Sequence, residues 1–271
     1  MCKDCGCTLG NIHSHEHTHA DGTTHSHSHD HAHTHSHNHS HDHSHDNLNA
    51  HPELNETKTI EVIQKILTQN DHEAEHNRAH LDEAGILCVN LMSSPGAGKT
   101  TLLETTIKQS SFRIGVVEGD LETNKDANRI IQAGAKAHQI TTGQTCHLDA
   151  FMVHDGLHNL GLDNLDIVFI ENVGNLVCPA AYDVGAHINV VLLSVPEGSD
   201  KVAKYPVMFR RADCVIITKT SLLEHFNFSI QEVKSEVRKL NPKADIIEID
   251  SIKNIGVDKW IDYLKMKMEL R

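Results

Sequence analysis

The chain of 271 residues lacks any long apolar segment. None of its hydrophobic runs approaches the about 18 to 20 residues that a helix needs to cross a bilayer. Its N-terminus also lacks the basic stretch followed by an apolar one that marks a secretory signal. These two absences predict a cytoplasmic protein without a membrane span.

Positive charge is scarce as well. The sequence has 24 lysines and arginines against 37 aspartates and glutamates, which gives a formal net charge of −13. Proteins whose main partner is nucleic acid cluster lysine and arginine to neutralise phosphates. The acidic balance argues against such a partner and suits a protein that collects cations.

Cysteines are few, but three of the seven fall within the first seven residues. In a cytoplasmic chain they are expected to be metal ligands or free thiols rather than disulfides. Cys2, Cys5 and Cys7 can face one ion, because Gly6 permits a tight turn. Thiolates prefer Zn²⁺, Ni²⁺ and Cu(I) to Mg²⁺ and Ca²⁺.

Histidine is the abundant residue, with 25 copies that lie mostly before residue 52. Between residues 13 and 45 nearly every second residue is histidine, and the others are mostly small and polar. Such a tract has no face to bury, so we expect disorder. Neutral imidazoles bind Ni²⁺, Cu²⁺ and Zn²⁺, so residues 1–55 are predicted to form a metal-binding tail in which nickel and zinc are equally suited.

Two helices are expected to link this tail to the rest of the chain. Apolar residues at helical spacing predict an amphipathic helix over residues 57–69, and a second helix is expected over residues 71–83. The second helix carries His72, His76 and His80 on one face, which suits metal binding but also ordinary packing or solvation. The predicted domains are therefore the tail, a linker over residues 56–84 and one α/β domain over residues 85–271.

A glycine-rich loop at residues 91–101 follows an apolar run and precedes a helical segment, the order that a phosphate-binding P-loop requires. Gly98, Lys99 and Thr100 fill the last three positions of G-x-x-x-x-G-K-[ST], whereas Ser93 stands at the first glycine. Lys99 can reach the β- and γ-phosphates, and the Thr100 hydroxyl can bind Mg²⁺. The residues predicted to contact the nucleotide here are Ser94, Gly96, Ala97, Gly98, Lys99, Thr100 and Thr101.

Two later strands end in acids. The strand over residues 112–117 runs into Asp120, and the strand over residues 165–171 ends at Glu171. A carboxylate just past a parallel strand near a P-loop can hold Mg²⁺, and Gly174 is spaced from Glu171 as in the D-x-x-G element. The predicted catalytic set is Lys99, Thr100, Asp120 and Glu171. Alternating strands and helices predict a doubly wound, mostly parallel sheet of the P-loop NTPase type.

Cys146 and His147 stand at the start of a helix that is expected to end near residue 160. Both can face one ion only where the backbone is irregular, so the pair suits either a metal site or a buried thiol beside a polar cap. Cys178 follows the Glu171 segment and can join them. Metal occupancy and nucleotide state would then share one moving loop.

Taken together, these motifs resemble the HypB family of hydrogenase nickel-insertion GTPases. The resemblance covers most of the chain and is most specific at residues 146–149 and 171–180. It implies a GTPase that binds GTP, Mg²⁺, Ni²⁺ and Zn²⁺ and loads nickel into [NiFe] hydrogenase. It also implies a nucleotide- or metal-linked dimer, a HypA-type metallochaperone and the hydrogenase large-subunit precursor as partners. The implied metal ligands are Cys2, Cys5 and Cys7 at one site and Cys146, His147 and Cys178 at the other.

One element departs from the family pattern. Residues 218–221 read Thr-Lys-Thr-Ser where guanine recognition expects N-K-x-D. Lys219 can still lie along the base, but Ser221 replaces the acid that accepts two hydrogen bonds from guanine. Losing that acceptor costs on the order of 2 kcal/mol, which predicts weakened selectivity for GTP. We identify no water-positioning residue and no arginine finger, so slow, switch-like hydrolysis is expected.

Two other functions stay open. A urease-type nickel-insertion GTPase would carry a Cys-Pro-His motif, whereas Cys178 and Pro179 are followed here by Ala180. A nickel or zinc storage protein with weak nucleotide hydrolysis is compatible with the altered guanine element.

Overall fold

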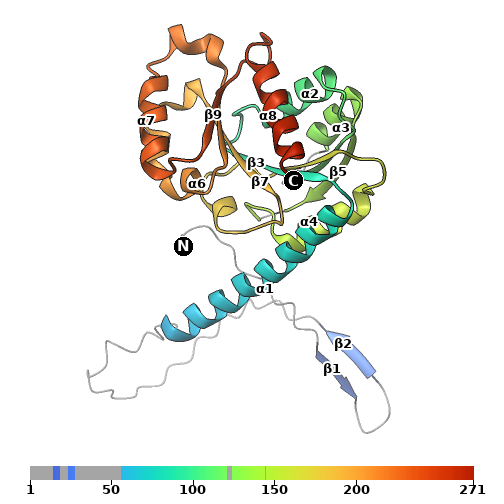
Figure 1. Ribbon diagram of the computed structural model, residues 1–271. Coiled ribbons are helices and arrows are strands. Elements are labelled where there is room, and N and C mark those ends of the chain that lie inside the picture. The colour runs from blue at the N-terminus through green and yellow to red at the C-terminus, as the bar shows by residue number, and fades with distance from the viewer. Residues whose placement is uncertain (1–14, 19–23, 28–55, 121–123, 144) are drawn as a thin grey trace, which may run out of the picture. The chain divides into compact units, whose positions relative to one another are not determined.

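The computed structural model describes residues 15–18, 24–27, 56–120, 124–143 and 145–271, which form two units, 1–59 and 60–271 (Figure 1). In the first unit, β1 (His15–Thr18) pairs antiparallel with β2 (Thr24–His27). This short pairing rests on backbone hydrogen bonds and needs no apolar face. Cys2, Cys5, Cys7 and most of the histidine tract lie outside the described residues. The predicted domain boundaries stay predictions.

The second unit is built on a parallel sheet, which confirms the predicted sheet type. It has seven strands in the order β5-β4-β6-β3-β7-β8-β9. The strands are β3 (Leu87–Ser93), β4 (Ile114–Asp120), β5 (Lys136–Thr141), β6 (Ile167–Glu171), β7 (Ile188–Ser194), β8 (Cys214–Thr218) and β9 (Asp245–Glu248). The strands β3, β6 and β8 are buried along their whole length, which is why they read as continuous apolar runs. Their carboxyl ends share one edge of the sheet, where ligands bind in folds of this type.

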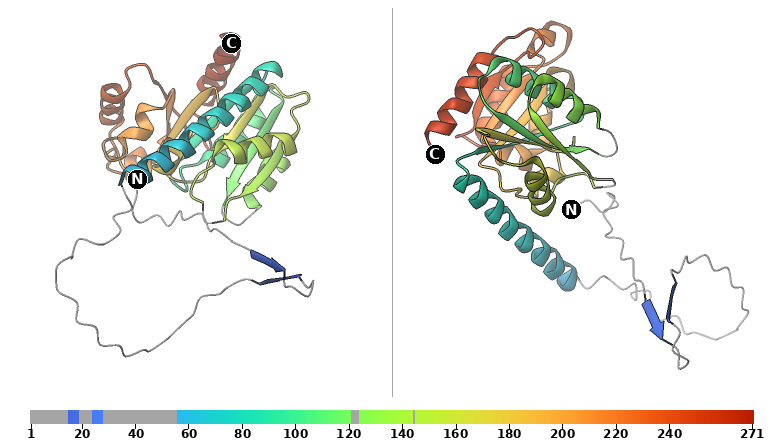
Figure 2. Two further views of the ribbon diagram at one scale, coloured as in Figure 1. Left: turned by 90° about the horizontal axis from the view of Figure 1, so that it is seen from below. Right: turned by 90° about the vertical axis from the view of Figure 1, so that its right-hand side faces the viewer.

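Helices cover both faces of this sheet (Figure 2). The longer ones are α2 (Lys99–Gln109), α3 (Lys125–Ala133), α4 (Ala150–Leu160), α7 (Ile230–Leu240) and α8 (Val257–Glu269); the short ones are α5 (Lys201–Lys204), α6 (Pro206–Arg210) and the 3₁₀ turns η1 (Cys178–Ala180), η2 (Val195–Glu197) and η3 (Thr220–His225). On one face, Leu102 of α2 and Trp260 of α8 pack on β3 and β6. On the other face, Leu157 of α4 packs on the same two strands.

The linker is a single helix, α1 (Glu56–Glu83), so the prediction of two helices is wrong. Residues 57–83 contain neither glycine nor proline, and nothing in the sequence interrupts the backbone ladder. Asn70 is buried at its middle, donates to the Asp183 carbonyl at 2.8 Å and accepts from the Ala150 N–H at 2.9 Å. This bonding fixes α1 against the start of α4. Within the described part of the chain, no helix combines the length and apolarity that crossing a bilayer requires.

Candidate nucleotide and metal sites

The phosphate loop joins β3 to α2. Gly96 and Gly98 have φ values of 73° and 102°, a region that residues with a Cβ rarely adopt. Gly98 is the N-cap of α2 and leaves the first N–H groups of the helix directed at the loop, where an anion would bind. Lys99 is buried, and its Nζ donates to Ser93 Oγ at 3.3 Å. The loop therefore has the backbone geometry and the cation that a phosphate requires.

Two glutamates lie beside the loop. Thr100 Oγ1 donates to Glu171 Oε1 at 2.7 Å, and Glu118 on β4 is in register with Glu171 on β6. Glu118 is 3% exposed and Glu171 is 4% exposed. Among the described residues, the Oε2 atom of each glutamate has no hydrogen-bond partner. Burial, and then repulsion from Glu171, raises the pKa of Glu118 to about 8. Burial also raises the pKa of Glu171, which Lys99 and Thr100 oppose.

These orphaned carboxylate oxygens next to a threonine hydroxyl fit Mg²⁺, which takes hard oxygen ligands. Sequence reasoning assigned Asp120 and Glu171 and missed Glu118. Asp120 is the last residue of β4, and its carbonyl accepts from the Thr142 N–H at 2.9 Å. The strand register, which cannot be read from one strand alone, is what places Glu118 opposite Glu171.

Three more predicted residues surround the same loop. Lys219, with φ 59°, donates from Nζ to the Gly96 carbonyl at 2.7 Å. A Cβ on Gly174 would lie only 2.9 Å from Pro95 Cα, so the loop after β6 touches the phosphate loop. Thr101, on the first turn of α2, receives a hydrogen bond from Arg129 at 3.4 Å.

The position expected to recognise guanine holds no free carboxylate. Both the N–H and the hydroxyl of Ser221 donate to Asp250 Oδ2. Asp250 Oδ1 accepts from the Lys253 N–H at 2.8 Å. Asp250 therefore stands beside Ser221 with both of its oxygens already engaged.

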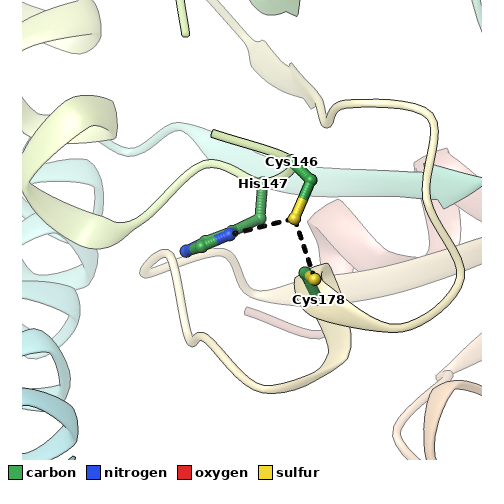
Figure 3. A group of neighbouring side chains, drawn as sticks. All are labelled: Cys146, His147 and Cys178. Atoms are coloured by element: carbon green, nitrogen blue, oxygen red, sulfur yellow. Dashed lines mark hydrogen bonds between the residues drawn. The ribbon is translucent and has the colours of Figure 1, made fainter. Parts of the chain in front are cut away.

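Cys146, His147 and Cys178 converge on one point (Figure 3). The two sulfurs are 2.9 Å apart, and Cys146 Sγ is 4.0 Å from His147 Nδ1. Asp149 caps α4 by accepting from the Met152 N–H at 2.8 Å, so Cys146 and His147 precede the helix in irregular backbone. This is the condition under which adjacent residues can face one ion.

The chemistry of this thiol cluster (Cys146, His147, Cys178) suits a soft or borderline cation. His147 is buried, and its ring stacks on Tyr182 with centroids 4.0 Å apart. Burial lowers the pKa of His147, which favours the neutral imidazole that binds metals. Two thiols and one imidazole match the preferences of Ni²⁺ and Zn²⁺ rather than Mg²⁺.

Two contacts connect the thiol cluster to the nucleotide acids. Asn172, next to Glu171, accepts from the Leu148 N–H at 3.1 Å. Leu148 also packs on Gly119, because a Cβ built on Gly119 would lie 2.8 Å from the Leu148 Cγ. The residue after His147 is thus held by the segments that carry Glu171 and Glu118.

Comparison with known proteins shows which family the chain resembles. The family model described as "CobW/HypB/UreG, nucleotide-binding domain" matches residues 87–248. The hydrogenase/urease maturation factor HypB of Helicobacter pylori strain J99 is 48% identical over 82% of this chain and 93% of its own length. The hydrogenase maturation factor HypB of Escherichia coli K12 is 43% identical, over 79% and 74%.

Solved structures agree with these relatives. HypB from Helicobacter pylori in complex with nickel is 46% identical with a TM-score of 0.72, and covers 74% of this chain and 95% of that one. HypB from Archaeoglobus fulgidus is 40% identical with a TM-score of 0.70, over 74% and 100%. The chain belongs to the HypB family within the CobW/HypB/UreG nucleotide-binding proteins.

Proposed function

We propose that this protein is a GTP-hydrolysing metallochaperone that binds nickel and promotes its insertion into [NiFe] hydrogenase. The observation that carries the proposal is the shared segment 171–178, which has a nucleotide-site acid at one end and a thiol of the metal cluster at the other. Relatives named hydrogenase maturation factors, and a related structure that is a complex with nickel, support this function.

The nucleotide reaction is transfer of the γ-phosphoryl group of GTP to water, which yields GDP and inorganic phosphate. Thr100, Glu171 and either Glu118 or Asp120 would hold Mg²⁺, which when bound neutralises charge on the β- and γ-phosphates. Lys99 leaves Ser93 and offsets the charge that develops in the transition state. Hydrolysis is slow, and the cycle acts as a switch.

Nickel is the cargo in this scheme, and zinc is a second cation that the same ligands accept. Cys2, Cys5 and Cys7 supply metal from the tail. Cys146, His147 and Cys178 give three ligands, which leaves a position for a donor from a second copy or for transfer. Phe151 in the first turn of α4 and Val177 next to Cys178 are 51% and 47% exposed, and a dimer would cover these apolar side chains.

Nucleotide state controls the cargo by moving Cys178 relative to Cys146. A bound γ-phosphate orders the Gly174 loop against the phosphate loop, and release of phosphate loosens it. In the cytoplasm, a HypA-type metallochaperone and the hydrogenase large-subunit precursor act as donor and acceptor of the metal.

Nickel titration of the full chain tests this function. Replacing Cys2, Cys5 and Cys7 by serine removes the tail thiols, so any thiolate-to-nickel absorption band then reports Cys146 and Cys178. We expect nickel affinity to differ by at least about fivefold between the GTP-analogue and GDP forms. Cys146→Ser should abolish the band. Equal affinity in both nucleotide states would refute the coupling.

Urease is a second candidate client, because relatives from Helicobacter carry the name hydrogenase/urease maturation factor. Activation of purified apo-urease and apo-hydrogenase by the nickel-loaded protein separates the two clients. A storage protein would activate neither.

A further inference from the structure

The helices α1 and α4 lie side by side (Figure 1), and histidines from both helices contact one another between them. His76 of α1 contacts His154 of α4 with ring centroids 5.2 Å apart, and His80 contacts His158 at 5.6 Å. His154 and His158 are themselves 4.5 Å apart. Four imidazoles from two helices therefore line one surface, which is not part of the thiol cluster.

A carboxylate completes a set of ligands at one end of this row. Glu73 Oε1 lies 3.0 Å from His154 Nδ1 and 3.4 Å from His76 Nδ1. One ligand atom from each of the three residues lies within 4.8 Å of the other two. A metal ion with bonds of about 2.0 to 2.2 Å to nitrogen and oxygen needs only a small inward movement of these atoms.

The three side chains are accessible to solvent, and a buried neighbour, Asn77, holds His154 in place. Glu73 and His154 are 22% and 25% exposed, whereas His76 is 62% exposed and can swing onto an ion. Asn77 is buried and donates to the Ala150 carbonyl at 2.8 Å, so its Oδ1 is held 3.1 Å from His154 Nδ1. This contact holds the His154 ring in place with Nδ1 toward Glu73, and an ion bound at Nδ1 would replace the proton that this nitrogen shares with Asn77 and Glu73.

We propose that Glu73, His76 and His154 form a binding site for a borderline divalent cation of the Zn²⁺ or Ni²⁺ class. Two imidazoles and one carboxylate on one side of the ion leave open positions on the other side, toward solvent. His80 and His158 lie next along the row and extend it with two further ligands. The site does not depend on the nucleotide function.

The position of His154 on α4 relates this site to the thiol cluster along the chain. His154 lies four residues beyond Ala150, the first residue of α4, or about 6 Å along the axis. Cys146 and His147 immediately precede that helix. The same helix therefore carries one ligand of the histidine site and follows directly on two ligands of the thiol cluster.

Histidine modification on the full-length protein tests the proposal site by site. Diethyl pyrocarbonate acylates an imidazole nitrogen that carries a free lone pair. Metal on one ring nitrogen leaves the proton on the other, so a ligating histidine is protected. Mass spectrometry of the peptides should show that Zn²⁺, and in a second arm Ni²⁺, protects His76 and His154 but leaves the exposed His225 reactive.

Matched glutamine variants decide whether the carboxylate is a ligand. Glu73→Gln should raise the metal concentration that half-protects His76 and His154 by at least about tenfold. Glu75→Gln, on the same helix and exposed, should leave it unchanged. Lack of protection in the unmodified protein, or equal protection in the Glu73 variant, would overturn the site. Cys146→Ser should keep the protection, which separates this outcome from failure of the thiol cluster.

Discussion

The phosphate loop and the thiol cluster are built in opposite ways. The loop is one contiguous stretch whose key side chains, Lys99 and Thr100, are buried and whose backbone shape is set by two glycines. The cluster joins residues 32 positions apart, and its two cysteines are half-exposed. A buried, preformed site holds a ligand in one geometry, whereas a half-exposed one assembled from two segments suits a ligand that must be passed on.

The two sites nevertheless depend on the same short segment. Gly174 touches Pro95 of the phosphate loop, and Asn175 Nδ2 donates to the Cys146 carbonyl at 3.4 Å. A change at the nucleotide can therefore reach the cysteines through adjacent residues. Variants can therefore show which residues affect only the nucleotide site, which affect only the thiol cluster and which affect both.

The largest effect is expected from Lys99→Ala, which breaks the phosphate loop alone. Removing the ammonium group eliminates the charge that faces the γ-phosphoryl group, so phosphate release should fall by at least about 100-fold. Lys108→Ala, an exposed lysine near the end of the same helix, is the control and should retain full activity. Metal binding by the tail and by the thiol cluster should persist in both variants. Retained hydrolysis in Lys99→Ala would contradict the nucleotide assignment.

Gly174→Ala tests the shared segment and should affect both sites. The added methyl group would lie 2.9 Å from Pro95 Cα, so one of the two loops must move. We expect about a tenfold loss in kcat/KM together with a shifted thiolate-to-nickel absorption band, at a stability cost of about 1 to 3 kcal/mol. Thermal unfolding followed by circular dichroism checks that the variant folds. A tenfold loss of hydrolysis with an unchanged nickel band would show that the sites are not coupled here.

The sheet was predictable because its central strands are long apolar runs that alternate with helical segments. The phosphate loop was predictable for a similar reason, since its spacing and its glycines are local. The failure in the linker has a non-local cause. Two linker helices were expected, but the buried bonds of Asn70 run to Asp183 and Ala150, which are distant in sequence.

The candidate sites were less predictable where they depend on register or on distant pairs. Glu118 faces Glu171 only because β4 and β6 are neighbours in the sheet, although their sequence positions differ by more than fifty. Asp250 reaches Ser221 across the end of β8 in the same way. The row of histidines on α1 suggested a metal site by itself, but its partner His154 belongs to another helix.

Glu118→Gln tests whether the nucleotide site, unlike the half-exposed thiol cluster, contains a buried carboxyl group that destabilises the protein when it ionises. The folded-state pKa of about 8 exceeds the ordinary 4.5, so between these pH values the folded protein binds more protons than the unfolded one. Stability of the nucleotide-free protein from this group is therefore lost as the pH rises from about 4.5 to about 8.

The amide cannot ionise, so Glu118→Gln should unfold at higher urea concentration than the unmodified protein at pH 8. The difference should be about 4 kcal/mol at pH 8 and should shrink to about 1 kcal/mol near pH 5. Glu83→Gln, on the exposed end of α1, should show no such pH-dependent difference. A difference that does not change with pH would show that Glu118 does not titrate with a raised pKa.

The smallest expected effect is on selectivity for the nucleotide base. The residues concerned follow β8 and β9, at the opposite end of the sheet from β5, which precedes Cys146. Ser221 offers no carboxylate, and both oxygens of Asp250 accept hydrogen bonds from within the protein, so neither residue can receive the two hydrogens of guanine without losing its present bonds. Competition binding should therefore give similar affinities for GTP, xanthosine triphosphate and ATP. Asp250→Asn should change their ratio by less than about twofold, because a neutral amide removes no contact to the base. A strong preference for GTP that Asp250→Asn abolishes would mean that Asp250 turns from Ser221 to the base when nucleotide binds.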